Sequence, residues 1–405
     1  MKRSVVSLLG CALAAAALPA SAQLSNDSVK IGVATDMASL YSDINGPGAV
    51  AAVEMAIADF GGSVLGKKIE MVSGDIQNKA DVAASLAARW YDNEKVDVIL
   101  GAGASSSSIA IMGVAGEKKR VYLATDPASS DITGKLCNPY TIHWVYDTAA
   151  LANGTGSAVV KSGGKDWFFL TVDYAFGYAL QRDVAAVVTK AGGKVVGEVK
   201  HPLNTQDFSS FLLQAQASKA QIIGLANAGG DTINSIKQAA EFGIVKGGQK
   251  LAGLLVFVSD IHSLGLERAQ GLRLTEPYYW DLNDRTRAFA KRFAEKHKNR
   301  MPTAIQAGFY SAALGYLEAV KAAGTDDPDK VMAQMKGRQW DDPIFGKSWV
   351  RPDGRKMHDF YLFEVKAPSE SKGPWDYYKQ LATIPADEAF RPMDQGNCPM
   401  VAKKN

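Results

Sequence analysis

The chain has 405 residues, of which 47% are hydrophobic and 21% are charged. This composition excludes intrinsic disorder and is typical of a soluble globular protein, and the length suggests two domains of roughly 150–200 residues each. The net charge is +3, and it is +1 without residues 1–22, which contain Lys2 and Arg3 but no acid. Such a balance gives no reason to expect nucleic acid or an anionic membrane as a partner.

Residues 1–22 have the three parts of a secretory signal peptide in order. Lys2 and Arg3 form a basic head, residues 5–18 are apolar, and Ala20-Ser21-Ala22 matches a cleavage site. The apolar stretch is shorter than the roughly 20 residues that a spanning helix needs. A membrane anchor and a lipid anchor at Cys11 are the alternatives. We expect an exported protein that begins at residue 23 and resides in a bacterial periplasm.

The mature chain opens with strand and helix patterns in alternation. Strands are predicted at 29–34, 68–73, 96–100 and 121–124, and helices at 48–60, 80–93 and 106–118. This rhythm predicts a parallel sheet covered by helices on both faces.

The same rhythm then restarts. Strands are predicted at 167–172, 194–199, 222–226 and 254–258, with helices at 177–191, 208–218 and 232–242. An extended aromatic stretch at 274–281 precedes helices at 284–298, 303–323 and 328–336. A hairpin is predicted over 344–366, with its turn at Pro352-Asp353-Gly354, and a loop-like tail follows Pro368.

Two similar α/β units in one chain predict two lobes with parallel central sheets, joined by more than one crossing. We assign residues 23–145 and 281–338 to the first lobe, residues 146–280 and 339–366 to the second, and residues 367–405 to a tail that wraps the surface. Ligands of open α/β sheets bind beyond the carboxyl ends of the strands. The cleft between the lobes is therefore the expected site.

The sequence lacks the motifs of several other classes of protein. It contains no P-loop, no GxSxG and no HExxH, and its five histidines are scattered, so we expect neither a metal site nor a cofactor. Cleavage of the signal peptide would remove Cys11, which leaves two cysteines, Cys137 and Cys398, in an oxidising compartment. A disulfide between them is predicted, with two isolated buried thiols as the alternative.

Two polar loops follow neighbouring strands of the first unit. Ser105, Ser106 and Ser107 open a helix after the strand at 96–100, and Pro127 and Ser129 lie in the loop after the strand at 121–124. Hydroxyls and the free N–H groups of a helix start suit a carboxylate. Simple helix capping and turn formation are the alternatives.

Further candidates lie on other loops at the same edge. They are Tyr41 in the long loop after the first strand, Asp147 at the first crossing, and Phe176, Asn227 and Asp260 in the second unit. For each of them, packing or capping is an equally good explanation. We expect at least two of the second-unit loop residues, which also include Tyr174 and His262, to touch a ligand.

Several of these segments resemble a known family in their order and spacing. VKIGVATDMASLYSDINGPGAVAAVEMAIADFGG, GAGASSSS, ATDPASSDITG and FFLTVDYAFGYALQRD are similar to segments of ABC-transporter substrate-binding proteins of the branched-chain amino acid type. The resemblance spans nearly the whole mature chain. It implies a type I periplasmic binding fold, in which two Rossmann-like lobes joined by three crossings close around a ligand.

The resemblance also implies roles for single residues. Ser105 matches a serine and Ser129 a threonine that hold the ligand carboxylate, Phe176 matches an aromatic wall residue, and Asp147 matches an acid at the first crossing. The ammonium half of the site departs from the family. The expected tyrosine falls at 227–230, where there is no aromatic residue, and the expected glutamate falls near Asp260. Both a branched-chain amino acid and an aromatic or other organic acid remain open as the ligand.

The function that follows is capture of a small carboxylate by the extracytoplasmic component of an ABC importer. The implied partner is a permease complex in the inner membrane, and a monomer is expected. A ligand sensor without a transport role is one alternative. A secreted enzyme is another, although no nucleophile pairs with His143 or His262 in the sequence.

Overall fold

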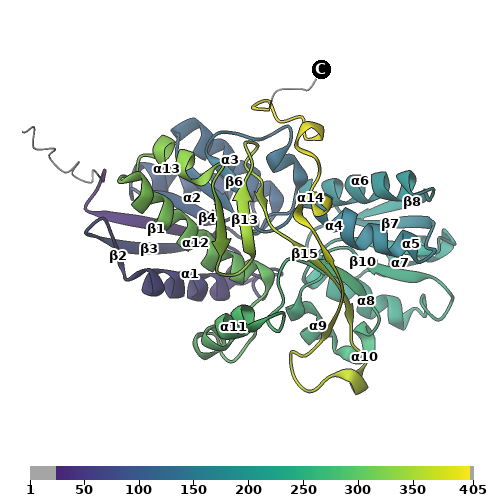
Figure 1. The fold of residues 1–405 in the computed structure, drawn as a ribbon. Coiled ribbons are helices and arrows are strands. Elements are labelled where there is room, and N and C mark those ends of the chain that lie inside the picture. Colours follow the sequence, from purple (N-terminus) through teal and green to yellow (C-terminus); the bar gives the residue numbers. More distant parts are fainter. Residues whose placement is uncertain (1–23, 402–405) are drawn as a thin grey trace, which may run out of the picture.

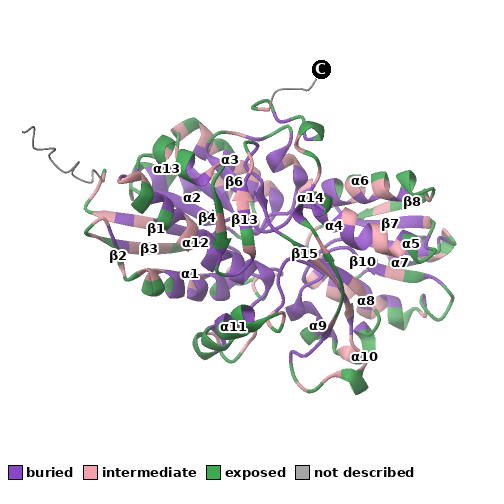
Figure 2. Cartoon of the chain, in the orientation of Figure 1, coloured by how far each residue is buried: buried purple, intermediate pink, exposed green. Residues whose placement is uncertain are grey.

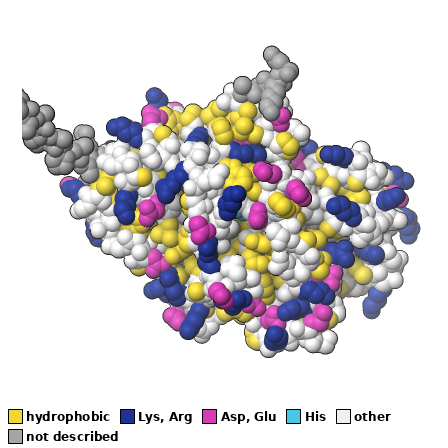
Figure 3. Space-filling view, viewed as in Figure 1, with side chains coloured by type: hydrophobic (Ala, Val, Ile, Leu, Met, Phe, Trp, Pro, Cys, Tyr) yellow, Lys and Arg dark blue, Asp and Glu magenta, His cyan; other side chains and the backbone are white. Residues whose placement is uncertain are grey.

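The computed structural model describes residues 24–401, so the predicted signal peptide lies outside the described residues. Figure 1 shows two lobes side by side, one containing β1 to β6 and the other containing β7 to β10. Buried residues follow the strands and the junction of the lobes, and exposed residues cover the outer helices (Figure 2). Charged side chains of both signs are interspersed over the face seen in Figure 3.

The first lobe is built on a six-stranded sheet in the order β2-β3-β1-β4-β5-β6, in which only β2 and β3 are antiparallel. The strands are β1 (Ser28–Thr35), β2 (Ser63–Val64), β3 (Lys67–Asp75), β4 (Val98–Gly101), β5 (Val121–Ala124) and β6 (Thr141–His143). The helices are α1 (Gly46–Phe60), α2 (Ala80–Asp92), α3 (Ser105–Lys118), α11 (Asp284–Lys296), α12 (Ala304–Ala323) and α13 (Pro328–Met335), with a 3-10 turn η1 (Ser130–Thr133).

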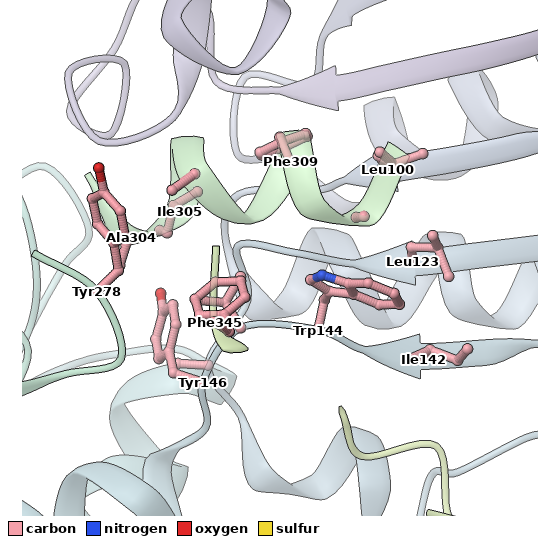
Figure 4. Packing of buried hydrophobic residues seen from close by; sticks show 14 of the residues in the cluster. Leu100, Leu123, Ile142, Trp144, Tyr146, Tyr278, Ala304, Ile305, Phe309 and Phe345 are labelled. Atoms are coloured by element: carbon pink, nitrogen blue, oxygen red, sulfur yellow. The ribbon is translucent and has the colours of Figure 1, made fainter. Parts of the chain in front are cut away.

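Helix α12 returns late in the chain to cover this sheet. Leu100, Leu123 and Ile142 come from three neighbouring strands, and Figure 4 shows them on the side of the sheet that faces Phe309 of α12. Thr303 and Gln306 form a capping box that begins α12, and the left-handed Gly324 ends it. The capped helix brings its first turn to the edge where the lobes meet.

The second lobe has a four-stranded parallel sheet in the order β10-β9-β7-β8. Its strands are β7 (Asp166–Val172), β8 (Lys194–His201), β9 (Ile222–Ala226) and β10 (Lys250–Gly253). Its helices are α4 (Thr148–Leu151), a π-helical turn η2 (Ala152–Gly156), α5 (Ser157–Lys161), α6 (Ala175–Lys190), α7 (Ser209–Ala217), α8 (Gly230–Glu241), α9 (Val258–Leu264) and α10 (Leu266–Ala269).

Two small antiparallel sheets complete the fold. One has the order β12-β13-β14 and the other β11-β15-β16. Their strands are β11 (Arg273–Glu276), β12 (Gln339–Asp342), β13 (Gly346–Val350), β14 (Lys356–Met357), β15 (Phe360–Val365) and β16 (Tyr378–Ile384), and the tail adds α14 (Ala386–Ala389) and the 3-10 turns η3 (Pro368–Glu370) and η4 (Met393–Gln395). The predicted α/β fold of two lobes with parallel sheets is therefore confirmed.

Three predicted elements differ from the structure. Residues 254–257 are not a strand, because β10 ends at Gly253 and α9 begins at Val258. The predicted hairpin holds only for β13 and β14, since β15 pairs instead with β11 and β16. The tail after Pro368 contains the strand β16 and the short helix α14 rather than loop alone.

The placement of residues 339–357 also differs from the sequence-based assignment to the second lobe. The ring of Trp340 lies 6.1 Å from that of Trp144, and Ser311 of α12 donates a hydrogen bond to Asp342. A backbone bridge joins Arg355 to His143 at the end of β6. These contacts place the β12-β13-β14 sheet on the first lobe, and the chain enters the second lobe only with β15.

The tail connects the two lobes covalently. After β16, whose partner β15 pairs with β11, the chain passes through α14 to Cys398, which forms a disulfide with Cys137 after η1 of the first lobe. Arg391 donates to the carbonyl oxygen of Ser130 on the way. The predicted disulfide is thus confirmed. Within residues 24–401, no helix is both long and apolar enough to cross a bilayer.

Replacing both Cys137 and Cys398 by serine should lower the free energy of unfolding by about 2–5 kcal/mol, because the bond closes a loop of 261 residues in the unfolded chain. Chemical denaturation measures the difference, and reduced wild type serves as the control. Equal stability of the oxidised wild type and the double variant would contradict this expectation.

Candidate functional site

A cavity lies where the carboxyl ends of both sheets meet, and about 320 Å³ there is not filled by atoms, including space that is open to solvent. The first lobe lines it with loop residues and the start of α12, the hinge adds Tyr146, and the second lobe closes it. Its lining residues are Tyr41, Ile44, Asn45, Gly103, Ser105, Asp126, Ala128, Tyr146, Tyr174, Phe176, Ala228, Leu255, Phe257 and Ile305. Figure 4 shows Tyr146 below the first turn of α12, which carries Ile305.

Ser105 lies at the start of α3 and is almost fully buried. Its Oγ accepts hydrogen bonds from the backbone N–H groups of Ala128 and Ser129, each at 3.2 Å. The hydroxyl hydrogen of Ser105 is therefore available as a donor. Ala104 precedes the helix without a side-chain cap, so the first N–H groups of α3 also have no cap from the chain. This corner of the cavity has the donors that a carboxylate requires.

Asp126 places a carboxyl group in the same cavity. Its Oδ2 accepts from the N–H of Gly103 at 2.7 Å and from the amide of Asn45 at 2.9 Å, and its Oδ1 accepts from Thr125 at 3.2 Å. Burial raises the pKa of Asp126 to about 7, although these hydrogen bonds oppose the shift. No lysine, arginine or histidine lines the cavity.

Aromatic rings form most of the remaining wall. Tyr146 donates to the backbone oxygen of Asp126 at 2.7 Å, and its ring meets Phe257 edge to face at 5.9 Å between centroids. The hydroxyls of Tyr41 and Tyr174 are 2.8 Å apart and join the two lobes across the cleft. Such walls suit a flat ring or a branched aliphatic group.

The lobes make further contacts beside the cavity. Ser130 donates to Asp183 of α6 at 2.7 Å, and Arg182 donates to Asp131 at 2.8 Å. Across the cleft, a side chain at Gly229 would approach the carbonyl oxygen of Leu40 to 2.7 Å, so a glycine with its φ of +55° permits the close approach. The structure therefore has the lobes in contact around the cavity.

Four of the residues predicted to touch a ligand, Tyr41, Ser105, Tyr174 and Phe176, line the cavity. Ser106 and Ser107 follow in the first turn of α3 but do not line it. The Oγ of Ser107 is buried without a hydrogen-bond partner. Pro127 does not line the cavity, and its carbonyl oxygen forms a hydrogen bond with His143 at 2.7 Å. Ser129 caps η1 through its side chain.

The other predicted residues have structural partners elsewhere. Asp147 caps α4 and lies 3.8 Å from Arg355. The side chain of Asn227 bonds Thr232 and His201 within the second lobe. Asp260 is not in a loop, because it lies in the first turn of α9 and accepts from the N–H of Phe257. None of the three lines the cavity.

The two histidines considered for catalysis are also held by the fold. His143 bonds the carbonyl oxygen of Pro127, and His262 bonds the hydroxyl of Tyr377 and stacks on Trp375 with 4.0 Å between centroids. Neither lines the cavity. Within residues 24–401, no three histidine, cysteine or carboxylate side chains are grouped as metal ligands.

The chain matches the periplasmic binding protein family over residues 28–374. It is 56% identical to a periplasmic binding protein from Burkholderia mallei, with a TM-score of 0.90, over 92% of this chain and 99% of that one. A branched chain amino acid ABC transporter periplasmic ligand-binding protein from Burkholderia xenovorans is 43% identical, with the same coverage and a TM-score of 0.82.

An ABC transporter solute binding protein from Rhodopseudomonas palustris, in complex with 3,4-dihydroxybenzoic acid, is 26% identical over 89% of this chain and 98% of that one, with a TM-score of 0.79. The match to the family covers most of the described residues, and the structural likeness extends to both lobes. The chain therefore belongs to the periplasmic binding protein family, among the ABC-transporter substrate-binding proteins of the branched-chain amino acid type.

Proposed function

We propose that this protein is the extracytoplasmic solute-binding component of an ABC importer and captures a small carboxylate ligand by closure of its two lobes. The observation that carries the proposal is the cavity at their junction, in which the start of α3 offers uncapped donors beside aromatic walls. The ligand carboxylate binds the Ser105 hydroxyl and the first N–H groups of α3.

The division of the lining between the lobes supports capture by closure. The first lobe supplies Asn45, Ser105 and Asp126, whereas the second supplies Phe176, Leu255 and Phe257. A ligand on the open first lobe gains the second set of contacts only when the lobes close. This difference in affinity shifts the population toward the closed form.

The ligand body is an aromatic ring or a branched aliphatic group. The rings of the wall offer faces and edges to a ring, and Ile44, Leu255 and Ile305 offer aliphatic contacts. The relative from Rhodopseudomonas palustris was solved with an aromatic acid, and the relative from Burkholderia xenovorans is described as a branched chain amino acid transporter component. In this proposal the closed lobes then dock on an inner-membrane permease from the periplasmic side.

A thermal-shift screen of the mature chain tests the proposal directly. The panel contains amino acids and small aromatic and aliphatic acids. A ligand at 100 times its dissociation constant should add about 2.7 kcal/mol to stability and raise the midpoint visibly. If none of the carboxylates in the panel stabilises the protein, the proposed capture of a carboxylate is contradicted. For a ligand found in this way, unchanged uptake in a deletion strain would contradict the transport role.

Replacing Ser105 by alanine should weaken binding of such a carboxylate by about 1–3 kcal/mol, because the replacement removes a buried donor. Ser106→Ala is the matched control, since its neighbouring hydroxyl does not line the cavity, and it should leave the affinity within about 0.5 kcal/mol. Calorimetric titration of both variants measures the difference. Equal affinities would remove Ser105 from the site.

Replacing Tyr174 by phenylalanine should weaken binding by about 0.5–1.5 kcal/mol, because the hydrogen bond to Tyr41 across the cleft is lost. Tyr178→Phe is the control, because Tyr178 is an exposed tyrosine in α6, the helix that begins directly after Tyr174. Affinity is measured by calorimetry, and the extent of lobe closure by small-angle X-ray scattering. If Tyr178→Phe weakens binding as much as Tyr174→Phe, the hydrogen bond between Tyr41 and Tyr174 has no specific role in closure.

A further inference from the structure

The cavity proposed to bind a carboxylate contains an acidic side chain of its own, Asp126. It is 3% exposed and lines the same cavity as Ser105. Asp126 lies in the loop that follows β5, and Ser105 accepts two hydrogen bonds from the same loop. Gly103, whose N–H donates to Asp126 at 2.7 Å, is two residues before Ser105, and the N–H of Ala128, two residues after Asp126, donates to the Ser105 Oγ at 3.2 Å. A ligand carboxylate bound at Ser105 therefore lies beside the Asp126 carboxyl group.

The surroundings of Asp126 contain no positive charge to separate two anions. Its hydrogen bonds come from neutral groups, namely the N–H of Gly103, the amide of Asn45 and the hydroxyl of Thr125. Arg355 of the hinge lies 3.8 Å from Asp147 and does not line the cavity. Two carboxylates that share a small site without a cation cannot both ionise readily, so one of them keeps a proton.

The other ionisable groups around Asp126 come from several elements. Tyr122 and Tyr146 interact with its charge, and burial holds the pKa of both tyrosines well above the usual range. Tyr41 and Tyr174 lie across the cavity, also with raised pKa values. These tyrosines stay neutral at all pH values of interest.

The remaining titratable neighbours lie behind this first layer. His143, bonded to Pro127, has its pKa lowered by burial and stays neutral. Burial raises the pKa values of Asp231 and Asp260 to about 7, and it also raises that of Glu276 well above its usual range, so the second lobe adds acids rather than bases. None of these four lines the cavity. Asp126 is thus the acid placed to share a proton with a ligand.

We infer that the ligand carboxyl group binds together with a proton that it shares with Asp126, so that this site takes up an acid and a proton as one unit. The inference rests on the proposed capture of a carboxylate. It assigns Asp126 as a specificity-determining residue, because a protonated Asp126 donates to a carboxylate and an ionised one repels it.

The experiment is calorimetric titration of the mature chain at pH 6 and pH 8 with three probes. They are 3,4-dihydroxybenzoate, 4-methyl-2-oxopentanoate and leucine, the last two sharing a carbon skeleton but differing in the ammonium group. Any carboxylate that stabilises the protein in the thermal-shift screen is titrated as a further probe. Because the pKa of Asp126 is about 7, an acid should bind about tenfold more tightly at pH 6 than at pH 8. Titration in phosphate and in Tris at pH 8 should reveal uptake of about 0.9 proton per ligand.

Asp126→Asn should abolish both the pH dependence and the proton uptake. Asp231→Asn is the matched control, since Asp231 also has a pKa of about 7 but does not line the cavity, and it should keep both. If Asp126→Asn does not fold, the proton uptake of the wild type still decides the inference. That uptake does not depend on any variant.

The other outcomes separate this inference from the proposed function. An acid that binds equally at both pH values, or a pH dependence that disappears in Asp231→Asn instead, would overturn the role of Asp126 and leave carboxylate capture intact. Binding of leucine alone, and more tightly at pH 8, would make Asp126 a counter-ion for an ammonium group and overturn the shared proton. Failure of every carboxylate at both pH values would overturn both proposals.

Discussion

The tight turn between β4 and α3 is the constraint on which the site depends. Gly101 has a φ of +112°, and a side chain there would approach the carbonyl oxygen of Ala34 to 2.2 Å, so the turn requires glycine. The N–H of Ala102 bonds that same oxygen at 2.6 Å. Because the central strand turns here at once into a helix, Gly103 and Ser105 reach the cavity at the end of the sheet. The loop after β5 then attaches to both of them.

The hinge holds the other side of the cavity through buried charges. Arg355 is fully buried and donates to the backbone oxygen of Tyr146 at 2.9 Å. The next residue, Lys356, lies 3.0 Å from Asp342 and beneath the ring of Trp144, and burial lowers its pKa to about 8. Removing one partner of a buried ion pair is strongly destabilising. These pairs therefore fix the crossing segments, and with them the position of Tyr146 in the cavity.

The alternation of strands and helices could be read from the sequence because buried parallel strands are continuous apolar runs between amphipathic helices. That signal failed at 254–257, where the residues are apolar because Leu255 and Phe257 line the cleft rather than because they pair. The partners of β15 could not be predicted either, since β11 lies more than 80 residues earlier in the chain.

The position of Ser105, Tyr41 and Phe176 at the cavity could be predicted because ligands of open α/β sheets bind beyond the carboxyl ends of the strands. Asp260 and Asn227 follow apolar runs in the same way but serve as a helix cap and a core contact. Asp126 lies in a loop singled out for its hydroxyls, yet no sequence signal marks an acid there as facing the cavity. Ile305 reaches the site only through the packing of α12, which no local pattern contains.

In the proposed capture by closure, the distribution of polar and apolar groups gives binding an order. Acceptors and donors for the ligand belong almost entirely to the first lobe, and the second lobe offers rings and aliphatic side chains. A polar group is fixed first, because its partners exist before closure. Closure then buries the ligand body, and burying roughly 200 Å² of apolar surface contributes about 5 kcal/mol at 25 cal/mol per Å². This is close to the roughly 5.5 kcal/mol needed to convert a mostly open population into a mostly closed one. In the proposed capture, the first lobe thus selects the charge of the ligand, and the second lobe selects its shape.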